Sequence, residues 1–466
     1  MTGESGVSRS GAFRVVICLQ KSPIPLRRSA FRIERFSGWL IVPRNWQAGL
    51  QLQPCVRADE AAIPRTASKA PEVFCKAPGG YHTERRSEST EGLAWAYARA
   101  SRGWNSAIGP GYVLRMTSAQ AERKVAVLGA GAWGTALAKV LAEKGDPVSM
   151  YCRRPDLVAQ INEEQRNGRY LPSATLPKTL TATVDPEEAL HGASMVVFVA
   201  PSHATREVAQ LVARKVPREA PIVSATKGIE NDSLTFIDEI LAAELPGETH
   251  RQFAFLSGPS FAKELAAGLP TGVVIASEDD RVREHVMHRF HAPYMRTYAS
   301  KDIPGVECGG AIKNVIAIAA GAADGLGFGH NTRAMLITRG LSEMVKLSLA
   351  RGGEAITLAG LAGMGDLVLT CCGELSRNRT VGLELGKGRK LPEILAGLGH
   401  VAEGVKTAKS AFDLGKKLGV ELPIIDETYR VLYEDKPVLD AVKDLMGREL
   451  TPEFESMGAL KAAPRA

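Results

Sequence analysis

Short apolar runs alternate with amphipathic stretches between residues 124 and 300, and this alternation is the main pattern of the chain. Seven runs have the length and composition of buried strands, the last being the weakest, and four segments between them have helical spacing. The predicted strands are Lys124–Leu128, Val148–Tyr151, Met195–Val199, Ile222–Ala225, Phe253–Leu256, Gly272–Ile275 and Tyr294–Tyr298. The predicted helices are Pro186–Leu190, His203–Lys215, Ser233–Glu244 and Asp280–Phe290. Such a pattern predicts βαβ units around a mostly parallel sheet.

From Val306 onward the strand pattern stops, and the chain becomes rich in Ala, Leu, Gly and Glu/Lys. Helices are predicted at Ala334–Leu349, Leu391–Leu395, Val405–Leu418 and Val438–Leu445. We place the boundary between Pro304 and Gly309. The predicted fold class is therefore α/β over residues 122–306, followed by an all-α domain over residues 307–450.

Residues 1–115 lack a sustained helical or strand period. They contain 17 Lys+Arg and 8 Asp+Glu, whereas the rest of the chain contains 41 and 43, so the basic pI belongs to this segment. It is too acidic and too long for an ordinary transit peptide, and a small extra domain is a second interpretation. We favour a third, in which translation begins at Met116 and the upstream stretch is a disordered or mistranslated extension.

The first strand is followed at once by G-A-G-A-W-G at residues 129–134 and then by an Ala/Leu-rich helical stretch. This order fits the G-x-G-x-x-G turn of a dinucleotide-binding unit. Gly129 permits the tight turn, Gly131 lets the backbone approach a pyrophosphate, and Gly134 lets helix and strand pack closely. The pattern predicts a Rossmann-type doubly wound sheet that binds a dinucleotide.

The end of the second strand bears on the choice of cofactor. A site for NAD usually has an acidic residue there for the ribose 2′-hydroxyl, but Arg153 and Arg154 stand at this position and Asp156 comes only afterwards. Guanidinium groups bind a 2′-phosphate bidentately. The alternative is that the two arginines form only an exposed basic turn and bind no phosphate. We expect NADP(H) to be preferred and NAD(H) to be tolerated.

Two later loops also follow predicted strands, where doubly wound sheets bind ligands. Lys227 lies in S-A-T-K-G-I after the fourth strand and is either an exposed loop lysine or a cation near the nicotinamide and the substrate. The small-residue turn S-G-P-S-F-A at residues 257–262 opens another helix, whose free N–H groups can meet an anion or a hydroxyl.

Lys313 is the only charged residue between Gly309 and Gly321, a stretch apolar on every face that predicts a buried helix. Burial of an ammonium costs several kcal/mol unless it is paired, and it lowers the pKa toward the range of a useful acid or base. The alternative is a lysine that snorkels from the helix start. Asn314 beside it can hydrogen-bond a substrate.

Asp366, between glycines and an apolar run, is a plausible partner for a lysine. Ser376, Arg377 and Asn378 offer clustered donors suited to a phosphate, although Ser376 can equally be a helix N-cap.

Composition argues against several other classes of protein and of binding site. No apolar run approaches the 18–20 residues of a membrane span, and no His/Cys spacing suggests a metal site. Seven scattered cysteines argue for reduced thiols in the cytoplasm. We expect a small-molecule substrate and no nucleic-acid partner. The oligomeric state is left open, with a homodimer as one option.

Eight motifs occur in order along residues 122–446. They are G-A-G-A-W-G-T-A-L-A at Gly129, A-T-K-G-I-E at Ala225, S-G-P-S-F-A at Ser257, K-N-V-I-A-I-A-A-G at Lys313, D-G-L-G-F-G at Asp324, G-L-A-G-M-G-D-L-V-L-T-C at Gly360, S-R-N-R at Ser376 and V-A-E-G-V-K-T at Val401. Together they closely resemble the bacterial-type NAD(P)-dependent glycerol-3-phosphate dehydrogenases. Residues 1–115 are not covered.

The resemblance implies a Rossmann domain and a helical domain of the 6-phosphogluconate-dehydrogenase type. It implies reversible NAD(P)H-dependent reduction of dihydroxyacetone phosphate to sn-glycerol 3-phosphate for phospholipid synthesis, with Lys313 as the catalytic proton donor or acceptor. The implied substrate contacts are Lys227, Gly258, Ser260, Lys313, Asp366, Ser376, Arg377 and Asn378. The implied cofactor contacts, with the motif glycines Gly129, Gly131 and Gly134, are Ala132, Trp133, Arg153, Arg154, Tyr170, Lys227, Ala262, Arg377, Val401 and Glu403. Position 132, often Ser in the family, is Ala here.

Two other functions compete. A β-hydroxyacid-type dehydrogenase acting on a sugar acid or ketopantoate would share the two-domain plan, but S-R-N-R and A-T-K-G speak against it. A non-catalytic dinucleotide sensor is disfavoured because Lys313 and Asp366 are both present.

Overall fold

The computed structural model describes residues 35–36, 39–40, 124–398, 402–450 and 452–453 of the 466-residue chain. The chain divides into two compact units, Met1–Val113 and Leu114–Ala466. In the first unit, β1 (Arg35–Phe36) pairs antiparallel with β2 (Trp39–Leu40). The extension predicted for residues 1–115 otherwise lies outside the described residues.

The second unit contains an eight-stranded sheet in the order β12-β11-β10-β9-β8-β3-β4-β7. Every neighbouring pair is parallel except β10 and β11, so the predicted mostly parallel sheet is confirmed. The strands are β3 (Lys124–Leu128), β4 (Val148–Tyr151), β7 (Leu180–Thr183), β8 (Ala193–Phe198), β9 (Ile222–Ser224), β10 (Phe253–Ser257), β11 (Thr271–Ala276) and β12 (Met295–Ser300). The strand order reverses beside β3, which is where doubly wound sheets bind ligands.

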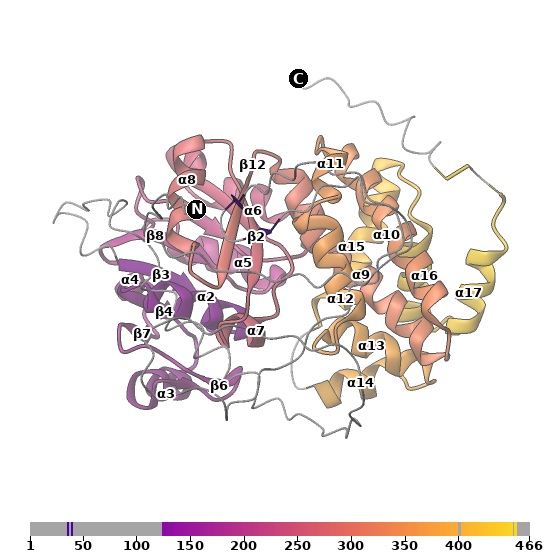
Figure 1. Cartoon of the computed structure of the whole chain (residues 1–466), viewed down its shortest axis with the longest axis horizontal. Coiled ribbons are helices and arrows are strands. Elements are labelled where there is room, and N and C mark those ends of the chain that lie inside the picture. Colours follow the sequence, from indigo (N-terminus) through magenta and orange to yellow (C-terminus); the bar gives the residue numbers. More distant parts are fainter. Residues whose placement is uncertain (1–34, 37–38, 41–123, 399–401, 451, 454–466) are drawn as a thin grey trace, which may run out of the picture. The chain divides into compact units, whose positions relative to one another are not determined.

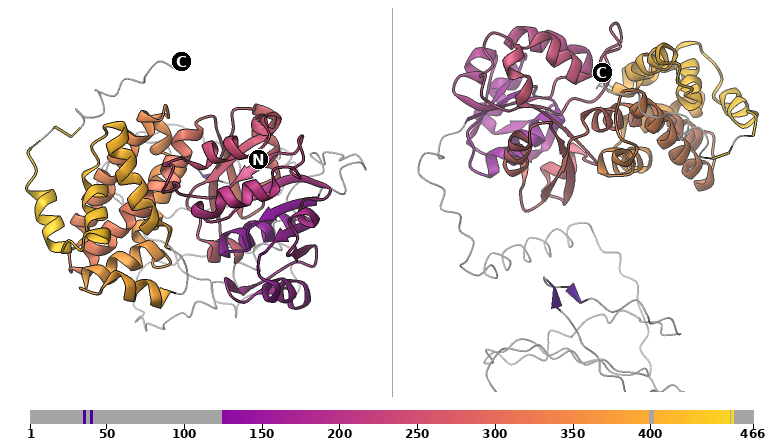
Figure 2. Two further views of the ribbon diagram at one scale, coloured as in Figure 1. Left: turned by 180° about the vertical axis from the view of Figure 1, so that it is seen from behind. Right: turned by 90° about the horizontal axis from the view of Figure 1, so that it is seen from above.

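Both faces of this sheet are covered by helices, as Figures 1 and 2 show. Along β3, Val125 and Val127 enter one apolar core, whereas Ala126 and Leu128 enter the other. A strand buried on both faces must be apolar throughout, which explains the continuous run in the sequence. The helices are α2 (Ala132–Glu143), α3 (Pro155–Glu164), α4 (Pro186–Leu190), α5 (Ser202–Val212), α6 (Ile237–Glu244), η3 (Gly247–Gln252), α7 (Ala262–Ala266) and α8 (Asp280–Phe290).

The structure differs from the predicted elements in several places, and it contains helices that were not predicted, such as α3 (Pro155–Glu164) and α16 (Pro423–Tyr433). The short strand β7 and the hairpin of β5 (Arg166–Asn167) with β6 (Leu171–Thr175) were not predicted, because they are short, partly exposed and lack a continuous apolar run. The helix predicted from Ser233 begins only at Ile237. Leu234 has a φ of 59°, outside the helical range, and the polar turn before the helix is held by hydrogen bonds to Glu230.

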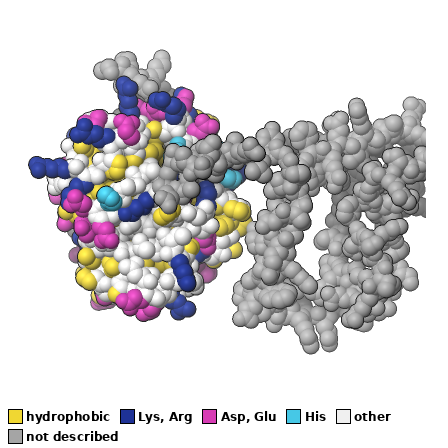
Figure 3. Space-filling view, turned by 90° about the vertical axis from the view of Figure 1, so that its left-hand side faces the viewer, with side chains coloured by type: hydrophobic (Ala, Val, Ile, Leu, Met, Phe, Trp, Pro, Cys, Tyr) yellow, Lys and Arg dark blue, Asp and Glu magenta, His cyan; other side chains and the backbone are white. Residues whose placement is uncertain are grey.

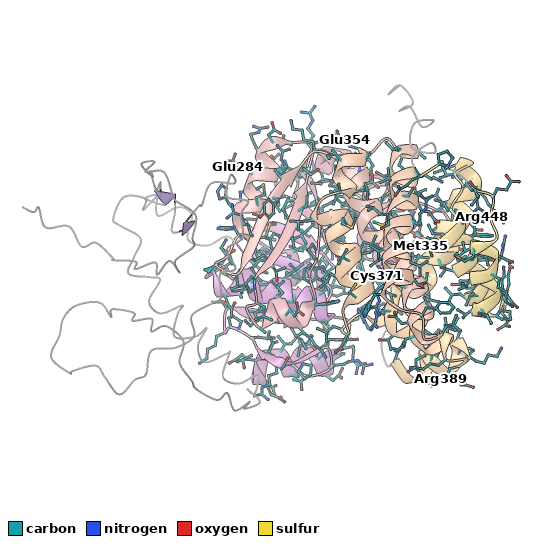
Figure 4. All side chains as sticks on the ribbon, turned by 45° about the vertical axis from the view of Figure 1, so that its right-hand side comes forward. Glu284, Met335, Glu354, Cys371, Arg389 and Arg448 are labelled. Carbon is teal, nitrogen blue, oxygen red and sulfur yellow. The ribbon has the colours of Figure 1, made fainter. Side chains whose placement is uncertain are left out.

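The second half of this unit is helical, as predicted, and surrounds the 23-residue helix α9 (Ile303–Gly325). The other helices are α10 (His330–Ala350), α11 (Ala355–Leu358), η4 (Leu361–Gly365), α12 (Asp366–Cys372), α13 (Arg377–Gly386), α14 (Leu391–Leu398), α15 (Glu403–Leu418), α16 (Pro423–Tyr433) and α17 (Val438–Met446). In Figure 4, Cys371 of α12 lies inside this half, whereas Arg389 and Arg448 lie at its periphery.

Helix α9 corrects one expectation from the sequence. Within the described residues it is long and apolar enough to cross a membrane, with a mean hydropathy of 1.3 over 18 residues. Yet 89% of that window is buried inside the protein, which is what a core helix of a folded domain requires. The face drawn in Figure 3 shows cationic and acidic side chains interspersed, in line with the near balance of charge after residue 115.

Candidate active site

Two lysines share one buried carboxylate where the sheet meets the helical half. The Lys313 ammonium donates to Oδ1 of Asp366 at 2.5 Å, and the Lys227 ammonium donates to Oδ2 at 2.8 Å. Asp366 is fully buried and Lys313 is 7% exposed. The expected pairing of Asp366 with a lysine is confirmed, and the structure adds that it pairs with both lysines. Because two ammonium groups meet one carboxylate, this cluster keeps a positive charge for an anionic ligand.

Each of the three residues comes from a different element. Lys227 lies in the loop after β9, Lys313 lies in the middle of α9, and Asp366 is the first residue of α12. A Cβ on Gly309 would lie 2.2 Å from the backbone oxygen of Ala362, so only glycine lets α9 pass this close to η4. The close passage brings Asp366, directly after η4, beside Lys313.

Burial changes the acid strength of Lys313. The pKa of its ammonium is lowered to about 8, because desolvation, helped by the positive charge of Lys227, outweighs the opposing effect of Asp366. A lysine with such a pKa exists in both protonation states near neutral pH, as a group that donates and accepts protons must. Snorkelling from the helix start, the alternative from the sequence, does not fit its buried ammonium.

Thr370 completes this cluster, although the sequence pattern did not point to it. Its hydroxyl accepts from the Lys313 ammonium at 3.0 Å and donates to the backbone oxygen of Asp366 at 2.6 Å. Thr370 stands four residues after Asp366 on α12, so the two share one helix face. The spacing of four residues from Asp366 could have indicated from the sequence that Thr370 lies beside the same lysine.

The S-R-N-R segment begins α13, and its residues separate into different roles. Ser376 is the N-cap, because its hydroxyl accepts the N–H of Arg379 at 3.2 Å. Arg379 pairs with Asp324 at 2.7 Å. Arg377 is exposed, and within the described residues no ion pair is formed by its guanidinium. Arg377 is thus the arginine of this segment that is available to an anion.

Asn378 links three segments around the lysine cluster. Its amide donates to Oδ1 of Asn314, the neighbour of Lys313, at 2.9 Å, and its oxygen accepts the N–H of Gly404 at 3.0 Å. Glu403, the first residue of α15, lies in the electrostatic field of the same site. Burial raises the pKa of its carboxyl to about 6, and the charges of Arg377, Lys227 and Lys313 oppose that rise.

Gly258 and Ser260 close the other side of this cluster. The backbone oxygen of Gly258 accepts from the Lys227 ammonium at 3.3 Å and from the Ser260 hydroxyl at 2.9 Å. Ser257, which precedes them, has a buried hydroxyl without a partner among the described residues. Ala262 is the first residue of α7 and is partly exposed.

The glycine motif between β3 and α2 fits a dinucleotide. Gly129 has a φ of 128°, and a Cβ there would lie 2.8 Å from the backbone oxygen of Val199. Gly131 is the N-cap of α2 and has open space where a side chain would stand. The first turn of α2, from Ala132, contains no acidic residue, and no side chain caps its free N–H groups. These features suit a pyrophosphate at the helix N-terminus.

Trp133 connects this turn to the lysine cluster. Its indole N–H donates to the backbone oxygen of Ala225 at 3.2 Å, and its ring lies 6.0 Å from the Lys227 ammonium. The buried side chain of Asn167, which the sequence analysis did not single out, donates to the backbone oxygen of Ala130 at 2.9 Å and holds the turn. Its oxygen accepts the N–H of Tyr170 at 3.1 Å. The glycine turn and the lysine cluster therefore adjoin through Trp133 and Lys227.

Three further residues are expected from the sequence to contact the cofactor: Arg153, Arg154 and Val401. Arg153 and Arg154 are exposed at the end of β4, and Arg154 pairs with Asp156 at 2.7 Å. Arg153 forms no ion pair among the described residues, so it is the arginine of the two that is available to bind a phosphate. Val401 lies outside the described residues.

A Rossmann sheet with a glycine turn, joined to a helical half that supplies a buried lysine, defines a two-domain dinucleotide-dependent dehydrogenase. Two family models match the chain, described as the N-terminus and the C-terminus of NAD-dependent glycerol-3-phosphate dehydrogenase, at residues 124–283 and 302–443. The chain therefore belongs to the NAD-dependent glycerol-3-phosphate dehydrogenase family.

Individual relatives agree with the family models. The chain is 53% identical over 330 residues to a glycerol-3-phosphate dehydrogenase [NAD(P)+] of Geobacter sp. strain M21, covering 71% of this chain and 98% of the relative. It is 50% identical to that of Leptospira biflexa, with 71% and 99% covered. The crystal structure of glycerol-3-phosphate dehydrogenase from Coxiella burnetii is 40% identical, with a TM-score of 0.67 and coverage of 70% and 99%. The expected family and fold class are confirmed.

Proposed function

We propose that this protein reduces dihydroxyacetone phosphate to sn-glycerol 3-phosphate with NADPH or NADH, reversibly, and supplies glycerol 3-phosphate for phospholipid synthesis in the cytoplasm. The observation that carries the proposal is the buried Lys313 with its lowered pKa, bonded to Asp366 beside the dinucleotide turn. The relatives named as glycerol-3-phosphate dehydrogenases support the choice of substrate.

Lys313 is the proposed proton donor. The bound cofactor supplies the hydride, and the protein orients both reactants. During reduction, the Lys313 ammonium gives its proton to the developing C2 oxygen, and in the reverse direction the neutral amine takes the proton back. Asp366 and Thr370 hold the amine in place. Lys227, which shares Asp366, adds a second positive charge that stabilises the developing oxyanion.

Arg377 and the donors around Asn378 are the proposed anchor for the substrate phosphate. Arg377 is exposed at the start of α13, and the side-chain amide of Asn378 bonds Asn314 next to Lys313. A guanidinium binds phosphate through paired charge-assisted hydrogen bonds. Binding energy from the phosphate then fixes the reacting carbon near Lys313, so remote contacts contribute to the rate. Gly258 and Ser260 are proposed to contact the substrate from the opposite side.

The cofactor site is proposed to consist of the 129–134 turn, Trp133, Tyr170, Ala262 and Glu403, with Arg153 at the adenosine end. NADP(H) is the proposed preferred cofactor, since Arg153 stands where an NAD site has an acid.

A steady-state assay of the full chain tests the function. We expect oxidation of NADPH that depends on dihydroxyacetone phosphate, with weaker use of NADH and formation of glycerol 3-phosphate. Ketopantoate and sugar acids serve as alternative substrates. Turnover of one of these without turnover of dihydroxyacetone phosphate would show that the substrate is wrong, and nucleotide binding without any turnover would favour a sensor.

A further inference from the structure

Arg351, the C-cap residue of α10, reaches from the helical half to the first turn of α6 in the Rossmann half. Its guanidinium pairs with Asp238 at 3.1 Å and with Glu239 at 3.4 Å, and it lies 3.6 Å from the centre of the Phe236 ring. The side chain of Arg351 is only 10% exposed. Burial of a guanidinium costs free energy unless it is paired, and the pairing with two neighbouring acids holds the start of α6 against the end of α10.

Helix α9 holds the same turn from a second direction. The carboxyl group of Glu307 accepts the backbone N–H of Asp238 at 3.2 Å, and this N–H belongs to the first turn of α6, where a helix supplies no partner of its own. Oε2 of Glu307 lies 3.9 Å from the Arg351 guanidinium. The N-terminus of α6 is therefore held by two residues of the helical half, one from α9 and one from the end of α10.

The first turn of α6 and Lys227 border the same small cavity. Its lining includes Lys227, Ser257, Ile237, Glu307 and Gly310, and its volume of about 10 Å³ leaves room for one water molecule at most. A Cβ on Gly310 would lie 3.4 Å from Cγ of Lys227 and 2.8 Å from Oγ of Ser257. The stem of Lys227 therefore passes beside this cavity, and Ile237, the first residue of α6, forms part of the cavity wall.

We propose that Arg351 is a positioning residue for Lys227. By clamping the first turn of α6, it keeps the cavity small, so that the Lys227 ammonium stays on Asp366 beside Lys313. Residues 225–236 join β9 to α6 and carry Lys227 near their start, so the clamp holds the far end of the same loop. The role in catalysis rests on the proposed function, whereas the effect on the loop does not.

Hydrogen exchange in the full chain, followed by mass spectrometry, tests the effect on the loop without catalysis. Arg351→Met keeps an apolar stem beside Phe236 and removes the charge. Exchange over residues 225–230 should become at least about threefold faster, because backbone N–H groups lose protection when local structure loosens. Asp238→Asn weakens the same clamp from α6 and should act in the same direction, so the test holds even if Arg351→Met does not fold.

Arg289→Met is the matched control, because the ion pair of Arg289 with Asp146 also spans 3.1 Å. The side chains of that pair are 13% and 25% exposed, against 10% and 25% for Arg351 and Asp238. Arg289 lies at the end of α8, and it is not among the residues that line the described cavity. A similar loss of thermal stability is expected, but exchange over residues 225–230 and kcat/KM should stay within about twofold of the wild type.

Steady-state kinetics test the effect on the site. In Arg351→Met, kcat/KM for dihydroxyacetone phosphate should fall about tenfold, as a small misplacement of a catalytic group can cause. The fall of kcat/KM with pH should also move to higher pH, because the charge of Lys227 helps to lower the pKa of Lys313 to about 8. Asp366 on α12 and Glu403 on α15, the other charged groups around Lys313, are left unchanged by this substitution.

Each outcome decides the matter. Unchanged exchange over residues 225–230 in both clamp variants overturns the proposal, and so does an active Arg351→Met enzyme with the wild-type pH profile. Equal effects in Arg289→Met also overturn it, because they would then reflect stability alone. If the exchange result is as expected but the wild-type chain does not reduce dihydroxyacetone phosphate, the clamp stands and the proposed function fails.

Discussion

At the scale of single residues, burial of the Lys313 ammonium costs free energy of folding, but it also lowers the pKa of the proposed proton donor. It is buried in the stretch Gly309–Gly321 of α9, which has no other charged residue, and Asp366 and Thr370 are its hydrogen-bond partners. Replacing it by Met keeps the length and the apolar packing but deletes the amine. We expect kcat to fall by about 10²–10⁴-fold, as for loss of a general acid, while NADPH binding by fluorescence titration stays near normal.

Arg377→Ala is the matched comparison, because it removes a proposed substrate anchor rather than the proton donor. The KM for dihydroxyacetone phosphate should rise steeply, with a smaller change in kcat. If Lys313→Met keeps more than about a tenth of the wild-type kcat, which is above the range for loss of an acid catalyst, Lys313 is a structural residue.

The pKa of Lys313 also predicts opposite pH profiles for the two directions. With a pKa of about 8, the amine is mostly protonated below pH 8 and mostly neutral above it. Reduction needs the ammonium, so its kcat/KM should fall as the pH rises through about 8, whereas kcat/KM for oxidation should rise over the same range. Assays in both directions at low substrate concentration from pH 6.5 to 9.5 measure this. Parallel profiles would exclude Lys313 as the titrating group.

Arg153 and Arg154 are neighbours in sequence but should differ in effect. Arg154 already pairs with Asp156, whereas Arg153 has no ion pair among the described residues. Arg153→Gln should raise the KM for NADPH about tenfold, because it removes a charge-assisted hydrogen bond to the 2′-phosphate. The KM for NADH should rise much less, because NADH has no 2′-phosphate. Arg154→Gln should change both by under threefold. A larger effect at Arg154 would mean that it leaves Asp156 when the cofactor binds.

At the scale of elements, the crossing of α9 and α13 sets the distance between Lys313, the proposed proton donor, and Arg377, the proposed phosphate anchor. Gly321 and Gly325 of α9 face Gly382 and Gly386 of α13, and a Cβ on Gly382 would lie 1.9 Å from the backbone oxygen of Ile318. The Asp324–Arg379 ion pair holds the same crossing. Lys313 and Asn314 lie on one helix of this pair, and Arg377 and Asn378 lie on the other.

Gly382→Ala should therefore separate the two helices. We expect a loss of stability on the order of 1–3 kcal/mol or more and a raised KM for dihydroxyacetone phosphate. Gly397→Ala in α14 is the control, because its added methyl would meet nothing within 4 Å, and it should leave both quantities nearly unchanged. Thermal unfolding and steady-state kinetics measure the two effects. An unaltered melting temperature in Gly382→Ala would contradict the close crossing.

At the scale of the whole molecule, the candidate-site residues that the structure describes lie between positions 129 and 404. The 330 residues aligned with the Geobacter relative cover 98% of its length. We propose that residues 1–115 are not needed for catalysis. A protein that begins at Met116 should keep its kcat, KM and melting temperature. A large loss of soluble, active protein after this truncation would show that the upstream segment belongs to the folded enzyme.

The sequence alone determined the family, the division into a mostly parallel α/β half and a helical half, and the position of the dinucleotide turn. These features are local, because a strand, a glycine turn and a helix occupy consecutive residues, and apolar periodicity reports burial directly. It also singled out Lys313, since a single charge in the otherwise apolar stretch of residues 309–321 is visible without any contact.

Only the tertiary structure decided which charged groups meet. Asp366 stands 53 residues from Lys313 and 139 from Lys227, and no local pattern indicates that it bridges both. In the same way, Arg379 is taken by Asp324, which stands 55 residues away, so Arg377 is left for a ligand. Such pairing depends on how closely α9, η4 and α13 pack, and that packing is decided by glycines whose neighbours are distant in sequence.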